Sequence, residues 1–205
     1  MSKFLKIIAL CITLFFASEA LSEAGSPRIR YGIQWGYSGE AAAGTSYTFF
    51  NKYGTRISDS NPRHWEYYTN AFVSGDVGIE FLDYLAVTLK AGYRGVAKDY
   101  RIMPLEIQGS IFPWRYDQSG LFLIGSLGTA LSNGNFEDNV KIISAGMGLR
   151  RNIGLKISLD GFIRGNLYIT NPLPLDPYEG LIPRDRVVAS SGKFITIDLG
   201  LALYF

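Results

Sequence analysis

Apolar and polar residues alternate with a period of two along most of the chain after residue 25. In residues 193–205, isoleucine, leucine and phenylalanine occupy every second position, and mostly polar or small residues stand between them. Such alternation is the pattern of a β-strand whose two faces lie in different environments. We count eight such segments. They span residues 29–37, 71–81, 85–93, 105–111, 121–131, 141–150, 155–167 and 193–205.

The lengths of the strands and of their connections fit a membrane barrel. A tilted strand of roughly ten residues crosses the apolar layer of a bilayer. Short connections, near residues 82–84, 113–120 and 151–154, alternate with long ones at 38–70, 95–101, 132–139 and 170–192. This is the layout of a bacterial outer-membrane barrel with a periplasmic N-terminus. All eight prolines fall outside the middles of the predicted strands, as the need for backbone N–H donors requires.

A soluble sandwich or ligand-binding barrel would show the same alternation with its faces reversed. Aromatic residues at the strand ends, glycines along the polar face and a chain that stops on Tyr204-Phe205 favour an apolar exterior instead. We therefore predict an all-β fold, an eight-stranded antiparallel up-and-down transmembrane β-barrel with its apolar face outward and a polar, filled interior. The aromatic residues at the strand ends are Phe81, Tyr84, Phe112, Trp114, Tyr116 and Phe205 on the short-turn side, and Trp35, Tyr37, Tyr93 and Tyr168 on the other.

The N-terminal residues 1–24 have the features of a cleaved secretory signal. Lys3 and Lys6 precede an apolar run at residues 7–17, and small-residue cleavage sites follow. The predicted barrel domain is residues 25–205. Cys11 is the only cysteine and lies in the signal, so the mature chain has no thiol for disulfides, catalysis or metal binding.

Composition and charge exclude two further classes. A mean hydropathy of +0.10 leaves no room for a bundle of apolar membrane helices. A net charge of +2 without any block of like charges gives no reason to expect a nucleic-acid partner.

An export signal, eight alternating strands and a terminal strand ending in Phe205 resemble the small outer-membrane β-barrel proteins of Gram-negative bacteria. The resemblance covers residues 29–205 as architecture. It implies a location in the bacterial outer membrane, contact with membrane lipid and lipopolysaccharide, and recognition by the barrel-assembly machinery. Leu201, Leu203 and Phe205 would occupy that recognition signal.

The predicted interior carries charges of both signs. If the hairpin turn is centred on Asp83, Asp76 lies directly opposite Lys90, with Glu80 and Arg94 nearby. Glu106 on the next strand is within reach of Lys90 or Arg94. A structural salt-bridge network is the main interpretation, because paired ions offset much of the cost of burial. Acid-base chemistry or ion conduction by these groups is the alternative. Further inward charges are Lys156, Asp160, Arg164 and Asp198.

Candidate chemistry outside the interior is sparse. His64 is the only histidine, and Ser58, Asp59 and Ser60 precede it. Lipid-modifying barrel enzymes generally combine these residue types, but the spacing here matches no motif that we can name. The segment Glu137-Asp138 could bind a hard cation, although a polar turn explains it equally well. We therefore name no catalytic, cofactor-binding or metal-binding residue, and we predict no enzyme activity.

The long loops are the remaining functional candidates. The first loop is rich in aromatic residues and is predicted to form a hairpin that continues the first two strands beyond the membrane. Those aromatic residues either contact lipopolysaccharide and neighbouring proteins or pack within the loop. The proline-rich residues 171–183 are predicted to cap the barrel mouth. The predicted function is a structural, adhesive or surface-interaction role through the extracellular loops, with a lipid-modifying enzyme or a narrow solute channel as alternatives.

Overall fold

The computed structural model describes residues 27–64, 69–81, 84–96, 101–114, 119–132, 140–153, 157–176, 178 and 180–205. The predicted signal segment, residues 1–24, lies outside these residues. No helix among the described residues is long and apolar enough to cross a membrane.

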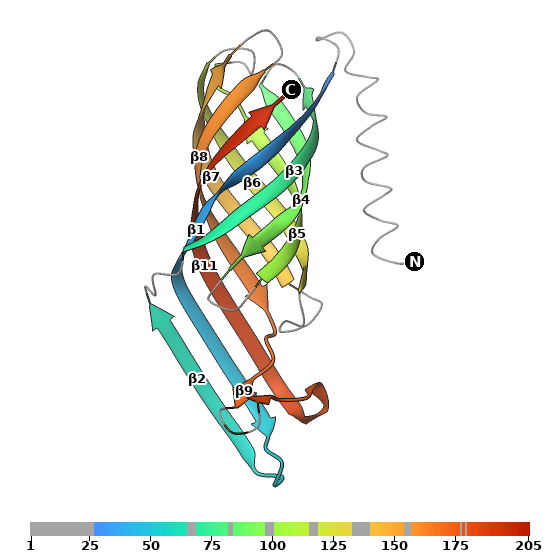
Figure 1. Cartoon of the computed structure of the whole chain (residues 1–205), viewed down its shortest axis with the longest axis vertical. Coiled ribbons are helices and arrows are strands. Elements are labelled where there is room, and N and C mark those ends of the chain that lie inside the picture. The colour runs from blue at the N-terminus through green and yellow to red at the C-terminus, as the bar shows by residue number, and fades with distance from the viewer. Residues whose placement is uncertain are drawn as a thin grey trace.

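Eight antiparallel strands form a closed barrel (Figure 1). One nine-stranded sheet has the order β11-β8-β7-β6-β5-β4-β3-β1-β2, and an additional pairing of β11 with β1 closes the ring and leaves β2 outside it. The barrel is therefore of the predicted up-and-down type. Its strands are β1 (Arg28–Phe50), β3 (Thr69–Phe81), β4 (Leu85–Gly95), β5 (Arg101–Ile111), β6 (Gly120–Ser132), β7 (Val140–Asn152), β8 (Ser158–Thr170) and β11 (Val187–Tyr204).

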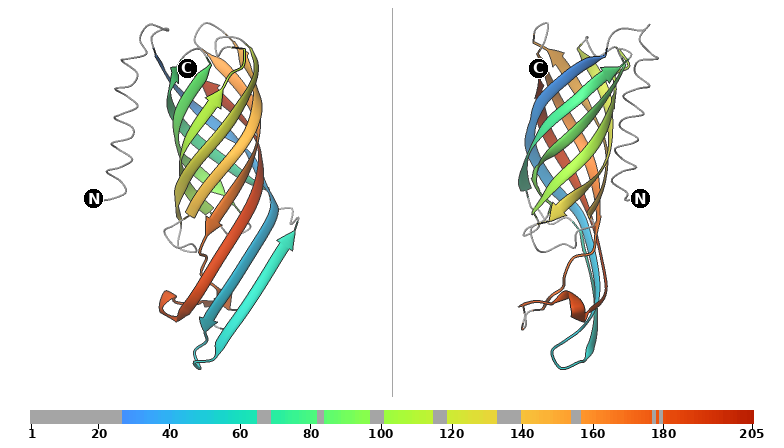
Figure 2. Two further views of the ribbon diagram at one scale, coloured as in Figure 1. Left: turned by 180° about the vertical axis from the view of Figure 1, so that it is seen from behind. Right: turned by 90° about the vertical axis from the view of Figure 1, so that its right-hand side faces the viewer.

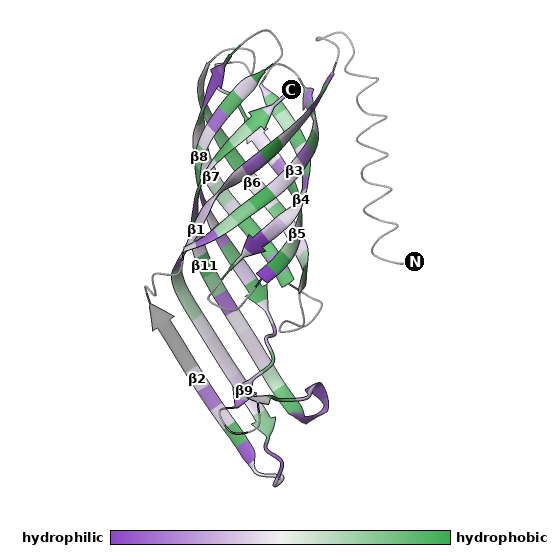
Figure 3. Ribbon diagram, in the orientation of Figure 1, coloured by the Kyte–Doolittle hydropathy of each residue, from purple (hydrophilic) through white to green (hydrophobic). Residues whose placement is uncertain are grey.

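The apolar face of the barrel points outward, as predicted. In β11, Leu199 is 68% exposed, whereas the neighbouring Asp198 is fully buried. In β6, which is apolar on both faces, Leu121 and Leu123 point outward while Phe122 and Ile124 point into the barrel. Figure 3 shows the resulting alternation of apolar and polar colour along each barrel strand. Exposed apolar side chains over the whole wall define a surface suited to lipid rather than water.

Two strands extend far beyond the barrel. β1 has 23 residues and β11 has 18, although about ten residues suffice to cross a membrane. Beyond the barrel, β1 pairs with β11 on one side and with β2 (Arg56–His64) on the other. The three strands form a sheet that projects from the end opposite the C-terminus (Figures 1 and 2). We call residues 42–50, 56–64 and 187–191 the projecting sheet. The predicted hairpin in the first loop is thus confirmed, and β11 also takes part in it.

A β-bulge separates the projecting sheet from the barrel. Glu40 pairs with Thr196 but Ala42 pairs with Ile195, so β1 contains one extra residue at this point. A bulge of this kind shifts the alternation of side chains by one position. Odd-numbered residues of β1 face outward up to Tyr37, but the odd-numbered Ala43 and Phe49 are buried. Because the alternation of inward and outward residues is interrupted at the bulge, the sequence predicted that this strand ends at residue 37.

Two prolines that lie outside the predicted strands are found inside observed strands. Pro104 is the fourth residue of β5, which begins earlier than the predicted residue 105. Its pairing with Ala130 of β6 is intact, but the pairing of β4 with β5 is interrupted at Gly92 and Tyr93. Because proline has no N–H, the wall loses hydrogen bonding on one side only. Pro62 lies in β2, the edge strand of the sheet, where a missing donor costs little.

Most of the described members of the predicted aromatic belts are exposed, Phe81 is half-buried, and two members are buried. Trp35, Tyr37, Tyr93, Tyr84 and Trp114 are exposed at the ends of the barrel wall, and so is Phe205. Phe112 and Tyr168, however, are buried inside the barrel. Each occupies one of the alternating positions whose side chains point inward, so its ring fills part of the lumen. Tyr116 lies outside the described residues.

Inward glycines make room for large side chains in the narrow barrel. Gly36 and Gly200 face each other across β1 and β11. A methyl group added at Gly200 would come within 2.6 Å of the Phe162 ring and 2.8 Å of the Phe72 ring. The two rings, 6.2 Å apart between centroids, therefore occupy the space that the glycines leave. An eight-stranded barrel is just wide enough to be filled in this way.

The lipid-facing assignment predicts a depth-dependent cost for charge. Leu199→Arg, at the middle of the β11 wall, should lower the free energy of unfolding by about 2–4 kcal/mol, because it places a cation in the apolar layer. Ile29→Arg, also outward but at the end of β1 that the sequence predicts to face the periplasm, should cost about 0–1 kcal/mol. Reversible urea unfolding from lipid vesicles measures both values. Equal costs at the two positions would contradict the assignment.

Candidate functional site: the filled interior and the projecting sheet

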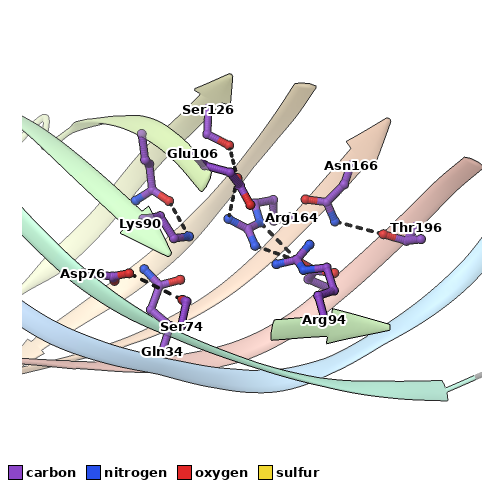
Figure 4. A network of polar contacts seen from close by, with 12 residues as sticks. Gln34, Ser74, Asp76, Lys90, Arg94, Glu106, Ser126, Arg164, Asn166 and Thr196 are labelled. Atoms are coloured by element: carbon purple, nitrogen blue, oxygen red, sulfur yellow. Dashed lines mark hydrogen bonds and ion pairs between the residues drawn. The ribbon is translucent and has the colours of Figure 1, made fainter. Parts of the chain in front are cut away.

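The central part of the barrel interior contains a network of ion pairs (Figure 4). Asp198 of β11 accepts contacts from Arg94 of β4 at 2.8 Å and from Arg164 of β8 at 2.9 Å. Arg164 lies next to Asp198 in the strand register, whereas Arg94 reaches it across the lumen. Arg164 is also 3.7 Å from Glu106, to which the Ser126 hydroxyl donates a hydrogen bond of 2.7 Å. The network thus ties together strands on opposite sides of the barrel.

A second network lies nearer the periplasmic end. Arg150 of β7 and Asp160 of β8 are register partners and form two hydrogen bonds of 2.8 Å, the fork geometry that arginine and carboxylate favour. Glu80 bridges this pair to Arg30, at 3.5 Å from Arg150 and 3.0 Å from Arg30. The guanidinium group of Arg30 also stacks 4.1 Å from the Tyr204 ring centroid. Aromatic faces therefore replace part of the water that these cations give up on folding.

Cations and carboxylates are nearly equal in number in each part of the interior. The central one combines Lys90, Arg94 and Arg164 with Asp76, Glu106 and Asp198. The periplasmic one combines Arg30 and Arg150 with Glu80 and Asp160. Isolated buried ions would be prohibitively costly, so local neutrality is what allows so many charges in a dry interior. The predicted salt-bridge interior is therefore present.

The partners of Lys90 differ from the prediction. Asp76 lies directly opposite Lys90 in the register, as predicted, and Glu106 lies opposite on the other side. Among the described residues, however, no carboxylate lies within ion-pair distance of Lys90, which donates a hydrogen bond of 3.1 Å to Gln108. Asp76 accepts from the Tyr204 hydroxyl at 3.1 Å instead. The long, flexible side chain of Lys90 can reach residues on several strands, so the strand register alone does not determine which residue it contacts.

The remaining interior predictions had mixed outcomes. Glu106 pairs with Arg164 rather than with Lys90 or Arg94. Asp160, Arg164 and Asp198 all point inward as predicted, whereas Lys156 lies outside the described residues.

Tight packing leaves little space for solute in the interior. Two internal cavities, beside Lys90 and beside Arg30, have volumes of about 10 Å³ each, the minimum that a single water requires. Asp76, Lys90, Glu106 and Asp198, which a conducting path would have to pass, are 0–3% exposed.

An apolar cluster lies among the inward residues towards the projecting sheet. It consists of Ala43, Val96, Ile102, Ala130, Val140, Ile142, Tyr168 and Phe194.

One face of the projecting sheet is covered by residues 171–176 and 180–183. The Ser190 hydroxyl donates a hydrogen bond to the carbonyl oxygen of Pro172, and Pro172 and Ile182 are buried. This segment contains the short strands β9 (Leu175–Asp176) and β10 (Gly180–Leu181), and the 3-10 helix η1 (Arg184–Arg186) follows it. It lies beside the sheet in Figure 2 and does not cross the barrel mouth. The predicted cap is therefore wrong in its position.

The other face of the projecting sheet is flat, exposed and rich in hydroxyl groups. Ser60, Ser46 and Ser191 form one row across β2, β1 and β11, and Ser58 and Thr48 lie in the next row. The hydroxyl oxygens of Thr48 and Ser58 are 3.2 Å apart. In Figure 3 the parts of β1 and β11 just below the barrel are mostly pale, in contrast to the green of the barrel wall. This part of the molecule is built to meet water or polar partners.

The aromatic residues of the first loop differ in their exposure. Phe49 is buried under the sheet, whereas Tyr53 at the hairpin turn is 80% exposed. Trp65, Tyr67 and Tyr68 lie outside the described residues, as do Glu137 and Asp138.

The residues considered for lipid chemistry all lie on β2. Side chains alternate along a strand, so Asp59 faces away from Ser58 and Ser60. The backbone of His64 is four residues beyond Ser60, roughly 13 Å along an extended strand. The side chain of His64 is not among those described. Strand geometry thus separates the serines from the carboxylate rather than bringing them together.

Comparison with known proteins finds similarity only among solved structures. No protein-family model matches the sequence, and a search of curated proteins finds no match. Among solved structures, the chain is similar to the outer membrane protein OprG from Pseudomonas aeruginosa, at 12% sequence identity and a TM-score of 0.40 over 86% of this chain and 95% of that chain. A similarity this weak carries no weight beside the barrel itself.

The barrel defines the class of this protein. A closed ring of eight antiparallel strands, an outward apolar wall and a charged, filled interior are the features of a transmembrane β-barrel of the outer-membrane type. Its exposed apolar wall is suited to contact with membrane lipid.

The periplasmic ion pair predicts strong energetic coupling. Arg150→Met or Asp160→Leu alone should each cost about 3–5 kcal/mol, because each leaves a buried charge without its partner. The double variant should cost clearly less than the sum. Urea unfolding from lipid vesicles measures the full cycle.

The matched control is the cycle of Lys90→Met and Asp76→Leu, whose charges face each other in register without a direct ion pair. Its coupling should be smaller than that of Arg150 and Asp160. A larger coupling for Lys90 and Asp76 would contradict the arrangement of the interior described above.

Proposed function

We propose that this protein is a non-catalytic outer-membrane barrel that uses its projecting sheet to contact partners at the cell surface. The observation that carries the proposal is the continuation of β1 and β11 past the barrel, together with β2, into a sheet with an exposed face. Loops are the usual place for function on a rigid scaffold, and here the scaffold itself extends into the loop region. An ordered sheet presents its side chains in fixed positions, which lowers the entropy cost of binding.

The filled interior supports a barrel that serves as an anchor rather than as a pore. Ion pairs join strands across the lumen, and the charged groups are almost fully buried. The separation of Asp59 from Ser58 and Ser60 supports the absence of a hydrolase site on β2.

Live-cell photo-crosslinking tests the surface role. A photoreactive amino acid at Ser46 or Ser58, on the exposed face, should give adducts with cell-surface molecules. The same group at Thr45, on the buried face of β1, is the matched control and should give none. If the exposed positions were as silent as Thr45, the proposal would be wrong.

Two assays address the alternatives. The purified protein should show no step conductance in planar bilayers. Cells that express the wild type and cells that express His64→Asn should give the same lipid A mass profile. An acyl-chain change that appears with the wild type and disappears with His64→Asn would establish the enzyme alternative instead.

We further propose that the terminal strand is read by the barrel-assembly machinery through Leu201, Leu203 and Phe205. Leu201 and Phe205 are exposed on the outer wall, and Leu203 between them is half-buried on the same face. The Phe205 ring also stacks on Tyr31, with 6.0 Å between ring centroids. Two roles for Phe205, as a signal and as a packing partner, can therefore be separated.

Phe205→Ser should sharply reduce the amount of heat-modifiable barrel in cells while leaving refolding into detergent micelles nearly unchanged. Tyr31→Ser removes the same ring contact but keeps the terminal residue, so it should assemble in cells almost as well as the wild type. Equal assembly defects in the two variants would show that Phe205 acts only through packing.

A further inference from the structure

A row of two lysines crosses the outer wall where the barrel meets the projecting sheet. Lys141 is the second residue of β7, and Lys193 lies in β11 where that strand leaves β8. Both are register partners of Ile169 in β8, which stands between them. Because neighbouring strands are about 4.8 Å apart, the two lysine backbones are separated by about 10 Å. Both side chains are exposed on the outward face, and neither has an ion-pair partner among the described residues.

Lipid-facing residues lie directly on the membrane side of this row. Two residues further along each strand are Ile143, Leu167 and Ile195, which are again in register with one another. Ile143 and Ile195 are 46% and 45% exposed on the wall. The lysines therefore stand at the edge of the apolar belt, where a long side chain can keep its stem on apolar surface and its ammonium group among lipid headgroups.

Hydroxyl groups lie on the other side of the row. In β11, Ser191 follows Lys193 away from the membrane and belongs to the row of Ser60, Ser46 and Ser191. Ser58 and Thr48 form the next row outward. The bulge in β1 is what places Ser46 and Thr48 on this face. No described residue in these two rows is acidic, and Asp59 faces the opposite side of β2.

From this order we propose that the outer wall formed by β7, β8 and β11, together with the exposed face of the projecting sheet, binds a phosphorylated glycolipid of the outer leaflet. Acyl chains lie against Ile143, Leu167 and Ile195. Lys141 and Lys193 bind a headgroup phosphate between them, and the serine and threonine rows donate and accept hydrogen bonds with the saccharide. The apolar, cationic and hydroxylated zones of this surface follow one another in the same order as the acyl chains, phosphate and saccharide of such a lipid. The inference rests on the proposed surface role and names one partner for it.

Native mass spectrometry of the purified barrel in detergent micelles tests the site. The probes are lipopolysaccharide with a short core oligosaccharide, the same molecule after enzymatic removal of its phosphates, and phosphatidylglycerol. The intact glycolipid should bind most tightly. Lys141→Gln or Lys193→Gln should weaken its binding about five-fold, and the double variant about thirty-fold, as about 1 kcal/mol per cation near an anionic surface implies.

Arg151→Gln is the matched control, because Arg151 is an exposed outward cation at the periplasmic end of β7. It should leave binding unchanged. The triple variant Ser46→Ala, Ser60→Ala and Ser191→Ala should weaken the intact glycolipid several-fold but leave phosphatidylglycerol unaffected. Heat-modifiable migration on a gel verifies that each variant is folded.

Three results would overturn the proposal. The first is equal binding of the phosphorylated and dephosphorylated glycolipid. The second is an effect of Arg151→Gln as large as that of Lys193→Gln. The third is phosphatidylglycerol binding as tightly as the glycolipid with the same lysine dependence, which would indicate a general anionic-lipid contact. If crosslinks at Ser46 yield only protein adducts while these assays fail, the surface role stands and the glycolipid site does not.

Discussion

Every backbone polar group in the wall of a membrane barrel must find its partner within the wall, because the lipid offers none. For this chain the requirement is met by the pairing of β11 with β1, which turns an open sheet into a ring. Closure at eight strands then fixes the width of the lumen, and the width determines the interior. Large side chains such as Phe72 and Phe162 fit only because Gly36 and Gly200 leave space beside them. The rest of the interior follows from this geometric limit.

Within that narrow lumen, charge and packing are combined in an orderly way. Arginines carry most of the buried positive charge, and a guanidinium group can bind a carboxylate with one edge while stacking on a ring with its face. Arg150 does both, since it binds Asp160 and lies 4.4 Å from the Phe112 ring centroid. The result is an interior held by directional contacts that join distant strands. Such contacts favour one arrangement of the strands over others of similar hydrophobicity.

The sequence predicted which way the side chains of a strand face and the register of neighbouring strands. It did not predict contacts between strands that are distant in the ring. Leu199 and Asp198 alternate clearly, so the facing of β11 was predictable, and the short turn at Asp83 correctly placed Asp76 opposite Lys90. The contact of Arg94 with Asp198 joins two strands on opposite sides of the ring, and no local pattern encodes it.

The end of β1 was missed for a different reason. Residues 39–44 are mostly alanine and glycine, which show no contrast between an inner and an outer face, and the bulge also reverses the parity. Of the candidate functional surfaces, the hairpin was foreseen. The rows of hydroxyl groups on the projecting sheet were not, because they require three strands in register.

The bulge at Glu40–Ala42 has a further consequence for how such a protein can change. On its barrel side, every residue has a fixed inside or outside position that an insertion of one residue would invert. On its far side, β1 and β2 form a hairpin whose pairing does not continue into the membrane. Residues added or removed there in matching numbers on β1, β2 and β11 change the height of the projecting sheet above the membrane and leave the wall untouched. The bulge therefore separates a barrel wall that tolerates no change of length from a projecting sheet whose length can change. Evolution can use this difference, and so can an engineer who wishes to display a peptide epitope.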